Sequence, residues 1–388
     1  MSAPENSQGL DRLAERAAEL ERTGEWSEAA VLYNLLAASA SAEANIEVMT
    51  DALRGEARVH LHLGQYERAV ELARQSLEAA DRHDLTRAAA RAINLTAALH
   101  YHRHDLEAAR NLYNEALERA RAINDDELIG LASMNLGVVL SLEGEAREAR
   151  LLYLECIAAA VRSGDRTAAG MAYNNLGLAC TVLGEWAEAS IYFDRGLEIA
   201  ERIGDRALIA RLQMNRADPL IRMGHTAQAA QALDRAEALA GSLSIADVLA
   251  TTARLRGAHA RVQGDRAAAA AHLERALDLA AREELRLEHA EALEALARLQ
   301  HEDGRHDGAI ASLRQARSEY AALGALHEVR RTDEWLTRWT EPGAPAGPDP
   351  AGDPHSQRAH QFRGAVEHRA GNDTSGVSAC GKGYVQRS

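Results

Sequence analysis

The sequence predicts an all-α solenoid of about eight helix-turn-helix units followed by a capping helix. The first observation is a column of alanines that recurs every 40 residues without a gap. The second is a glycine five residues before each alanine, with His104 as the one exception. The third is a small side chain seven residues before each of these turn positions. The alanines are Ala29, Ala69, Ala109, Ala149, Ala189, Ala229, Ala269 and Ala309. Phased columns of this length are typical of stacked repeats, in which no unit buries its apolar face alone.

Each unit is expected to contain two antiparallel helices. In the fourth unit, Leu128, Leu131 and Leu136 precede Gly144, and Ala149 and Leu152 follow it, at helical spacings of mostly three and four. Glycine adopts a positive φ without a Cβ clash, so Gly144 and its equivalent Gly184 are predicted to form the turn between the helices. The other turn positions are 24, 64, 104, 224, 264 and 304. Asp125, Asp165 and Asp205 share one phase between units, where a short acceptor caps the next helix.

The two ends of the chain depart from the repeat pattern. Residues 1–6 are predicted to be an N-terminal arm, and the solenoid is predicted to cover residues 7–340. A last helix at 326–340, with Trp335 and Trp339 on one face, is expected to cap the open end. Residues 341–388 contain five prolines within thirteen residues and then a Gly, Ser and His mixture, which predicts a disordered tail.

The charge balance limits the partners. The net charge of −14, from 44 basic and 58 acidic residues, argues against a nucleic-acid or anionic membrane partner. The N-terminus does not resemble a signal peptide, and no stretch is apolar enough to span a bilayer, so a cytoplasmic location is expected. Cys156 and Cys180 fall at apolar repeat positions and Cys380 in the tail, so no disulfide framework is expected.

The columns resemble those of the tetratricopeptide repeat family. In that family the alanine is followed four residues on by an aromatic residue or leucine, and three residues later by a small residue. Here those two columns are Tyr33, Tyr113, Tyr153, Phe193, Leu233, Leu273 and Leu313, and Ala116, Cys156, Gly196, Ala236, Ala276 and Ala316. The 40-residue unit is longer than the common one of about 34, and the usual proline at the unit end is missing. Longer units of this kind are similar to those of bacterial regulatory repeat proteins and kinesin light chains. The resemblance implies a right-handed solenoid that binds a peptide or protein segment in a groove lined by the first helices.

Three asparagines are the main candidates for binding a ligand. Asn135, Asn175 and Asn215 share one phase on the first helices, at the position with which several family members hold a ligand backbone. A carboxamide can serve both the N–H and the C=O of a peptide unit. The alternative is that these asparagines cap or brace a neighbouring helix. Asn94 and Asn174 lie beside this position.

Other groove positions of the family carry apolar and basic residues here. An apolar floor is predicted from Met134, Val138, Leu178 and Met214, together with Leu131 and Met171. Arg91 and Arg211, with Arg54, Arg58 and Arg222, favour a partner that carries a carboxylate. The alternative for the arginines is a solvated face paired with nearby glutamates.

No catalytic motif supports an enzyme. The histidines at 60, 62, 100, 102 and 104 cluster in two units, but residues two apart on a helix face different ways, so no metal and no other cofactor is expected. The sequence lacks a GxSxG elbow, a phosphate loop, HExxH and a paired CxxC. The predicted function is therefore a non-enzymatic scaffold or adaptor. The alternative is the sensory or regulatory region of a bacterial signalling system whose output domain lies on another chain.

Overall fold

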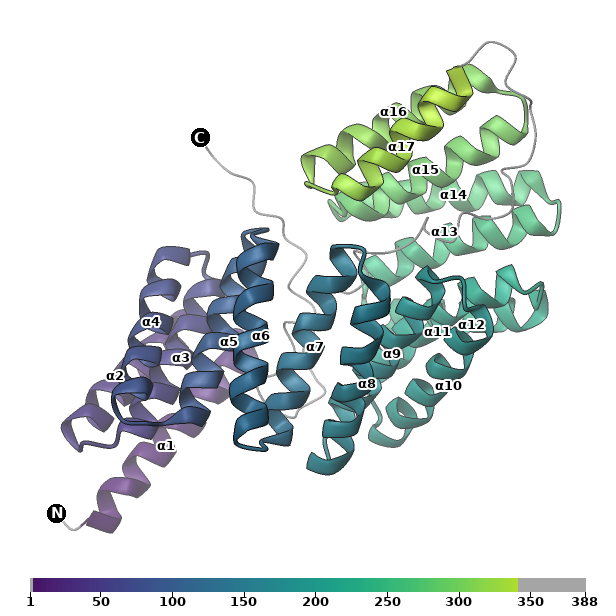
Figure 1. Cartoon of the computed structure of the whole chain (residues 1–388). Helices are drawn as coiled ribbons and strands as arrows, with labels where there is room; N and C mark the ends of the chain where they lie inside the picture. The colour runs from purple at the N-terminus through teal and green to yellow at the C-terminus, as the bar shows by residue number, and fades with distance from the viewer. Residues whose placement is uncertain (1–2, 341–388) are drawn as a thin grey trace. The chain divides into compact units, whose positions relative to one another are not determined.

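The structure, a computed structural model, describes residues 3–340 and contains seventeen helices and no strand within them (Figure 1). Eight consecutive helix pairs are followed by one further helix, which confirms the predicted fold class. The first helices of the pairs are α1 (Ala3–Thr23), α3 (Ile46–His62), α5 (Thr86–His102), α7 (Asp126–Leu142), α9 (Arg166–Val182), α11 (Arg206–Arg222), α13 (Ala246–Val262) and α15 (Arg286–Glu302). The second helices are α2 (Trp26–Ala42), α4 (Tyr66–Arg82), α6 (Leu106–Ala122), α8 (Ala146–Ser163), α10 (Trp186–Ile203), α12 (Thr226–Leu243), α14 (Arg266–Arg282) and α16 (His306–Ala322).

The helices at the two ends of the described chain can be compared with the predicted boundaries. Helix α1 begins at Ala3, four residues before the predicted start of the repeats, and the last helix, α17 (Leu326–Thr340), has the predicted bounds. The tail at 341–388 lies outside the described residues. None of the described helices combines the length and the apolar character needed to cross a bilayer.

The predicted turns adopt the backbone conformation that the glycine column suggests. Gly144 has φ +86° and Gly184 has φ +77°. His104 adopts the same left-handed conformation at φ +62°, so the one departure from the glycine column keeps the turn at the cost of a Cβ clash. Between units, Asp125 and Asp205 cap the next helix by accepting hydrogen bonds from Leu128 N (3.1 Å) and Leu208 N (2.9 Å).

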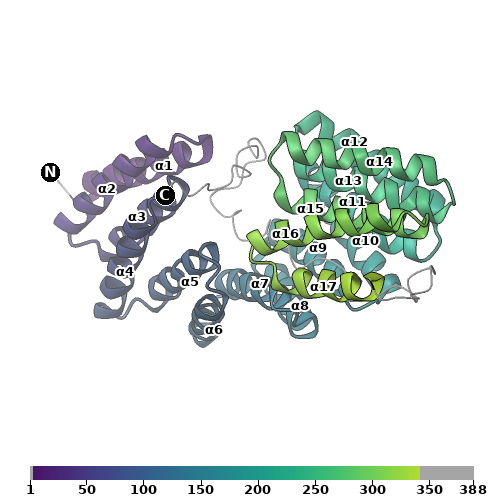
Figure 2. The same cartoon turned by 90° about the horizontal axis from the view of Figure 1, so that it is seen from above.

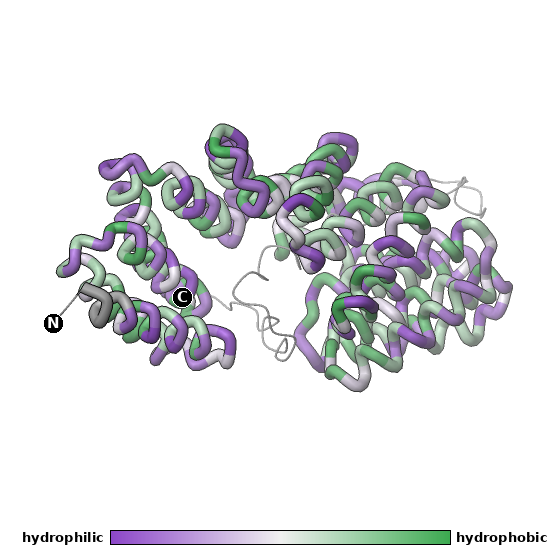
Figure 3. Tube along the Cα trace, turned by 90° about the horizontal axis from the view of Figure 1, so that it is seen from below, coloured by the Kyte–Doolittle hydropathy of each residue, from purple (hydrophilic) through white to green (hydrophobic). Residues whose placement is uncertain are grey.

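The small and aromatic columns meet inside each pair. A Cβ added to Gly137 would lie 2.6 Å from Cε1 of Tyr153, and one added to Gly177 would lie 2.6 Å from Cε1 of Phe193. Both rings and the whole anchor column of alanines are fully buried. Figure 3 shows hydrophobic and hydrophilic segments alternating along the helices, as expected when each helix buries one side.

The described chain divides into two compact units, each made of several repeats, with the boundary after Ala168 near the start of α9. From here on, the first unit and the second unit mean these two parts of the chain. In the first unit α1 contacts α3, α3 contacts α5 and α5 contacts α7, and in the second α11 contacts α13 and α13 contacts α15. The helix pairs of each unit can be followed in Figure 2. Since successive first helices contact one another directly, they form one continuous surface in each unit, and a candidate binding site is sought there.

Helix α17 closes the last pair. Trp335 is 4% exposed and packs with Ala297 of α15 and Leu313 of α16. Beside it, the buried carboxylate of Glu294 accepts hydrogen bonds from Arg331 and from the hydroxyl of Tyr320. This helix therefore supplies the apolar and polar contacts that another repeat would otherwise provide.

Candidate functional site

The predicted asparagines form buried pairs between neighbouring first helices. Nδ2 of Asn135 donates to Oδ1 of Asn94 at 3.3 Å, and Nδ2 of Asn215 donates to Oδ1 of Asn174 at 2.9 Å. Both pairs join residues 41 positions apart, which makes them the same contact in different repeats. One pair lies in the first compact unit and the other in the second. Asn135 is 1% exposed and Asn215 is 3% exposed. The bracing role, weighed above as the alternative, is thus visible in the geometry.

One acceptor of each pair is left over. Oδ1 of Asn135 and Oδ1 of Asn215 are buried and have no hydrogen-bond donor among the described residues. The third asparagine, Asn175, is 3% exposed, and its Oδ1 accepts a hydrogen bond from its neighbour Asn174 at 3.3 Å. Most buried polar atoms in proteins are hydrogen-bonded, so a repeated exception at equivalent positions requires a physical reason.

Four of the six apolar residues predicted for a groove floor are enclosed. Val138 and Leu178 are fully buried, and Met134 and Met214 are also buried. A first helix within a stack contacts second helices on one side and neighbouring first helices on two others, so little of its circumference is left accessible. These four side chains consequently belong to the packed interior. The other two predicted floor residues, Leu131 and Met171, are half-buried and keep part of their surface accessible.

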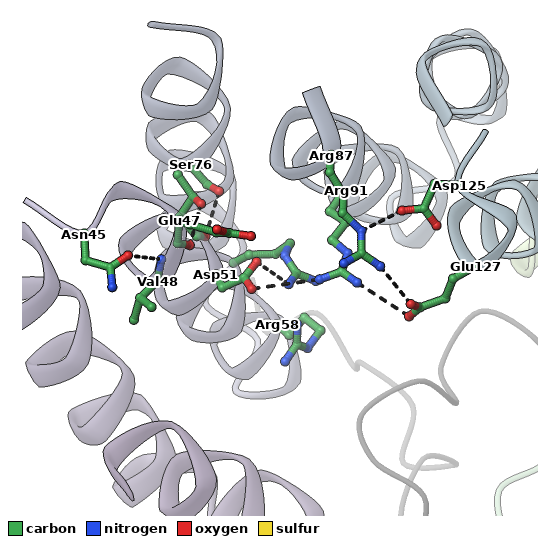
Figure 4. Close-up of polar contacts among 12 residues, drawn as sticks. Asn45, Glu47, Val48, Asp51, Arg58, Ser76, Arg87, Arg91, Asp125 and Glu127 are labelled. Atoms are coloured by element: carbon green, nitrogen blue, oxygen red, sulfur yellow. Dashed lines mark hydrogen bonds and ion pairs between the residues drawn. The ribbon is translucent and has the colours of Figure 1, made fainter. Parts of the chain in front are cut away.

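In the first unit, arginines and carboxylates alternate across α3, α5 and α7. Figure 4 shows Arg91 between two acids, with NH1 3.9 Å from Asp51 and NH2 3.5 Å from Glu127. Arg87 of the same helix donates to Asp125 at 2.6 Å and to Glu127 at 3.0 Å. Arg91 thus shows the pairing with acidic neighbours that the sequence left open.

The row of charges continues onto α1. Arg58 makes a two-pronged contact with Glu21, at 2.8 and 2.9 Å, and the hydroxyl of Tyr33 donates to the same carboxylate at 2.6 Å. Burial alone raises the pKa of Glu21, but the charge and hydrogen bonds of Arg58 and the hydrogen bond of Tyr33 outweigh it and lower the pKa below its usual value. Burial and the adjacent charges of Arg58 and Arg91 lower the pKa of Arg54. Arg54 therefore lies close to two other cations of this charge row.

The second unit has an equivalent set of pairs. Arg211 of α11 lies 2.7 Å from Asp247 of α13, and Arg254 of α13 lies 3.0 Å from Glu291 of α15. Arg261 of α13 donates to Glu302 of α15 at 2.6 Å. Of the predicted arginines, Arg58, Arg91 and Arg211 therefore pair with acids of a neighbouring first helix. Arg54 and Arg222 pair with acids of their own helix.

A pocket of about 370 Å³ lies in the second unit, between α11, α13, α14 and α15. Its wall consists of Asp218, Ile221, Arg222, Gly224, Arg254, Leu255, Gly257, Ala258, Arg261, Val262, Leu273, Ala295, Arg298 and Glu302. Of these, the sequence had singled out only Arg222 as a candidate for binding. Because the wall comes from three repeats and from different phases of the repeat, no single column of the sequence points to it.

The histidines are distributed among separate contacts. His60 lies 2.5 Å from Gln65, His100 lies 3.0 Å from Asp105, and the ring of His62 stacks on Trp26 at 4.2 Å. Within residues 3–340 there is no group of three or more His, Cys, Asp or Glu side chains placed to hold a metal ion. Cys156 and Cys180 are buried, as their apolar repeat positions predict.

Comparisons with known proteins agree with this architecture. Residues 168–242 match the sequence model of the tetratricopeptide repeat family. The apo form of RapI superposes with a TM-score of 0.54 at 15% identity over 70% of this chain and 97% of that one. Aspartyl phosphate phosphatase F from Bacillus subtilis gives a TM-score of 0.52 at 16% identity over 67% and 68% of the two chains. A Rap protein complexed with Competence and Sporulation Factor gives 0.51 at 13% identity over 87% of each chain.

No curated protein matches the chain. At these identities the solved structures show a shared fold alone. The matched residues 168–242 run from the end of the first unit to α12, in the middle of the periodic columns. Residues 168–242 thus match the tetratricopeptide repeat family in sequence, and the described residues share the fold of the superposed structures.

Proposed function

We propose that this chain is a non-enzymatic scaffold that holds an extended segment of a partner protein along its first helices. A tetratricopeptide repeat scaffold suggests protein–protein interaction as the general role. The observation that carries the finer proposal is the asparagine pair with one unpaired carbonyl oxygen, found at equivalent positions in both units.

The energetics favour opening of these pairs by a ligand. A buried acceptor without a donor costs about 1–3 kcal/mol, whereas the hydrogen bond between the two amides contributes about 0.5–1.5 kcal/mol. A peptide N–H that reaches the free Oδ1 removes the first cost. If the asparagine also turns its Nδ2 toward a peptide C=O, this bond replaces the amide–amide bond, and the partner asparagine's Oδ1 must then accept from a second peptide N–H or from water. The exchange gives each unit one point of attachment for a peptide backbone.

The partner must supply more than backbone hydrogen bonds, because association costs about 4–15 kcal/mol. The arginine rows on the same first helices supply charge for a carboxylate-bearing segment, although their present acidic partners must be displaced or shared. The solved Rap protein in complex with Competence and Sporulation Factor, which has a similar fold, supports a ligand-binding role.

A regulatory role is the second candidate. It is supported by the similar fold of RapI and of an aspartyl phosphate phosphatase. In this version the scaffold transmits ligand binding to an output protein on another chain. A purified output protein that binds the chain only when the peptide is present, or only when it is absent, would support it.

The test selects peptides from a random displayed library against the wild-type chain and rescreens them. The variant combines Asn135→Ala, Asn175→Ala and Asn215→Ala, and the control is Asn114→Ala, an exposed asparagine on the second helix α6. We expect peptides enriched on the wild type to bind the control equally and the triple variant at least about tenfold more weakly, which corresponds to about 1.4 kcal/mol. Equal binding to all three proteins, at equal helicity by circular dichroism, contradicts the asparagine proposal.

A further inference from the structure

We propose that the pocket between α11, α13 and α15 is a second binding site, for a small organic carboxylate with a short apolar body. This site is separate from the asparagine pairs and does not rest on the peptide proposal. Its ligand class follows from the charge of the wall, from one buried guanidinium and from the apolar residues between the charges.

The wall carries an excess of positive charge in an acidic protein. Four arginines line the pocket, at 222, 254, 261 and 298, against two carboxylates, Asp218 and Glu302. Glu302 accepts a hydrogen bond from Arg261 at 2.6 Å, and Arg266, which lies outside the wall, approaches it at 3.9 Å but pairs mainly with Asp303. Asp218 lies 3.3 Å from Arg222. Even when Glu291, which pairs with Arg254 from outside the wall, is counted, four cations face three carboxylates, and this balance favours an anion.

Arg254 is the most enclosed of these cations. The residue is 9% exposed, and its NH2 lies 3.0 Å from Glu291. Its Nε is buried without an acceptor among the described residues. A buried guanidinium that is paired on one edge alone gains more from a nearby anion than an exposed arginine does, because the surrounding protein screens the interaction less than water would.

Two further arginines are held in position by aromatic rings. The guanidinium of Arg222 lies 4.7 Å from the ring centre of Trp186, and that of Arg298 lies 5.0 Å from the ring centre of Trp335. Stacking restricts these long side chains before any ligand binds, which lowers the entropy lost on binding.

The remaining wall is apolar. Ile221, Leu255, Ala258, Val262 and Leu273 lie between the charged residues. Val262 is 49% exposed, so an apolar contact surface stays open at the pocket. The volume of about 370 Å³ lies at the lower end of the range for small-molecule sites. A compact ligand with one anionic end and a body of several carbons matches this combination.

Isothermal titration calorimetry at constant ionic strength tests the proposal, with octanoate as the probe. Hexanoate and butanoate report the apolar contribution, and octan-1-ol and octylammonium replace the carboxylate by a neutral or a positive group. We expect octanoate to bind the wild type and both charge controls to bind at least about tenfold more weakly, since a hydrogen bond to a charged group is lost. We expect each two-carbon shortening to weaken binding further.

Three variants locate the binding. Arg254→Gln removes the enclosed cation, and Ala258→Leu fills the pocket without changing charge. Arg314→Gln removes an exposed arginine on α16, outside the pocket wall, and serves as the control. We expect the first two to weaken octanoate binding at least about tenfold and the control to leave it unchanged.

The outcomes are decisive even if one variant is unstable. If Arg254→Gln loses helicity, Ala258→Leu decides the location alone. Failure of octanoate to bind the wild type overturns the proposal, and so does binding that is unaffected by Ala258→Leu or that is equally strong for octylammonium. Peptides bound through the asparagine pairs are measured separately, so neither result depends on the other.

Discussion

Packing at single residues explains why glycine or alanine recurs seven positions before each turn. At Gly137 the space for a Cβ is already taken by the ring of Tyr153, with ring atoms at 2.6, 3.0 and 3.1 Å. The ring itself is fully buried and has no room to withdraw. The first and second helices of this pair can approach as they do only because position 137 lacks a side chain.

Gly137→Ala is therefore expected to lower the free energy of unfolding by about 1–3 kcal/mol through overpacking, although alanine favours helices more than glycine does. Gly241→Ala is the matched control, because Gly241 is also helical and its Cβ would meet nothing within 4 Å. The control is expected to be neutral or stabilising by up to about 1 kcal/mol. Urea unfolding followed by circular dichroism measures both, and equal stability of the two variants would refute the packing argument.

Glu21 makes the stability of the first unit depend on pH. Its pKa is lowered in the folded chain, so its contribution is fully present above the unfolded pKa, near 4.3, and is lost as the pH falls through the folded value. Glu21→Gln is expected to cost about 1–3 kcal/mol at pH 7 and progressively less below about pH 4.

The measurement is the difference in free energy of unfolding between wild type and variant at pH 7 and pH 3. Glu19→Gln is the control, since Glu19 is an exposed carboxylate on the same helix and pairs with Arg16 at the surface. Surface pairs contribute about 0–1 kcal/mol, so the control is expected to change little at either pH. A cost for Glu21→Gln that stays constant from pH 7 to pH 3 would falsify the assignment.

At the scale of the helix pair, the left-handed turn conformation is adopted both by glycines, which favour it, and by a histidine, which does not. Position 104 needs the same left-handed backbone as positions 64 and 144, yet it carries histidine. For a residue with a Cβ, this conformation is about 1 kcal/mol or more less favourable than it is for glycine.

His104→Gly is expected to raise the free energy of unfolding by about 1 kcal/mol, and Gly144→Ala to lower it by a similar amount. Thermal unfolding by calorimetry gives the sign of both changes. A loss of stability in His104→Gly would mean that the histidine side chain contributes more than its backbone conformation costs.

Helix pairs, turns and the capping helix were predictable because each leaves a column in the sequence. Gly144 and Ala149 repeat at a fixed phase, and Trp335 follows where the columns stop. Exposure was not predictable in this way, since phase does not say whether water or a neighbouring helix faces a residue. Val138, for example, was placed on the groove by its phase, but neighbouring helices bury it fully. The pairing of Asn135 with Asn94 was also hidden, because it joins two different phases of the repeat.

At the scale of the whole molecule, each repeat is stabilised by its contacts with the neighbouring repeats. Trp335 covers Ala297 and Leu313 in the last pair, so Trp335→Ala leaves a cavity that is expected to cost about 3–5 kcal/mol. In a stack of repeats this loss concentrates on the adjacent pair.

Hydrogen exchange followed by mass spectrometry measures the spread of this effect. We expect faster exchange in α15 and α16 of Trp335→Ala, and unchanged exchange in α3 and α5. Glu334→Ala, an exposed residue of the same helix, is the control and is expected to match the wild type. Faster exchange throughout the chain would instead indicate that all the repeats unfold as one cooperative block.

The arginine–carboxylate pairs between successive first helices have a mechanical consequence. Arg91 bridges α5 to α7 and Arg211 bridges α11 to α13, so tension that spreads these first helices apart stretches an ion pair in each unit. Compression is resisted in a different way, by side chains that are already in close contact. Concentrated salt should therefore make each unit easier to pull open, by screening the pairs, without making it easier to compress.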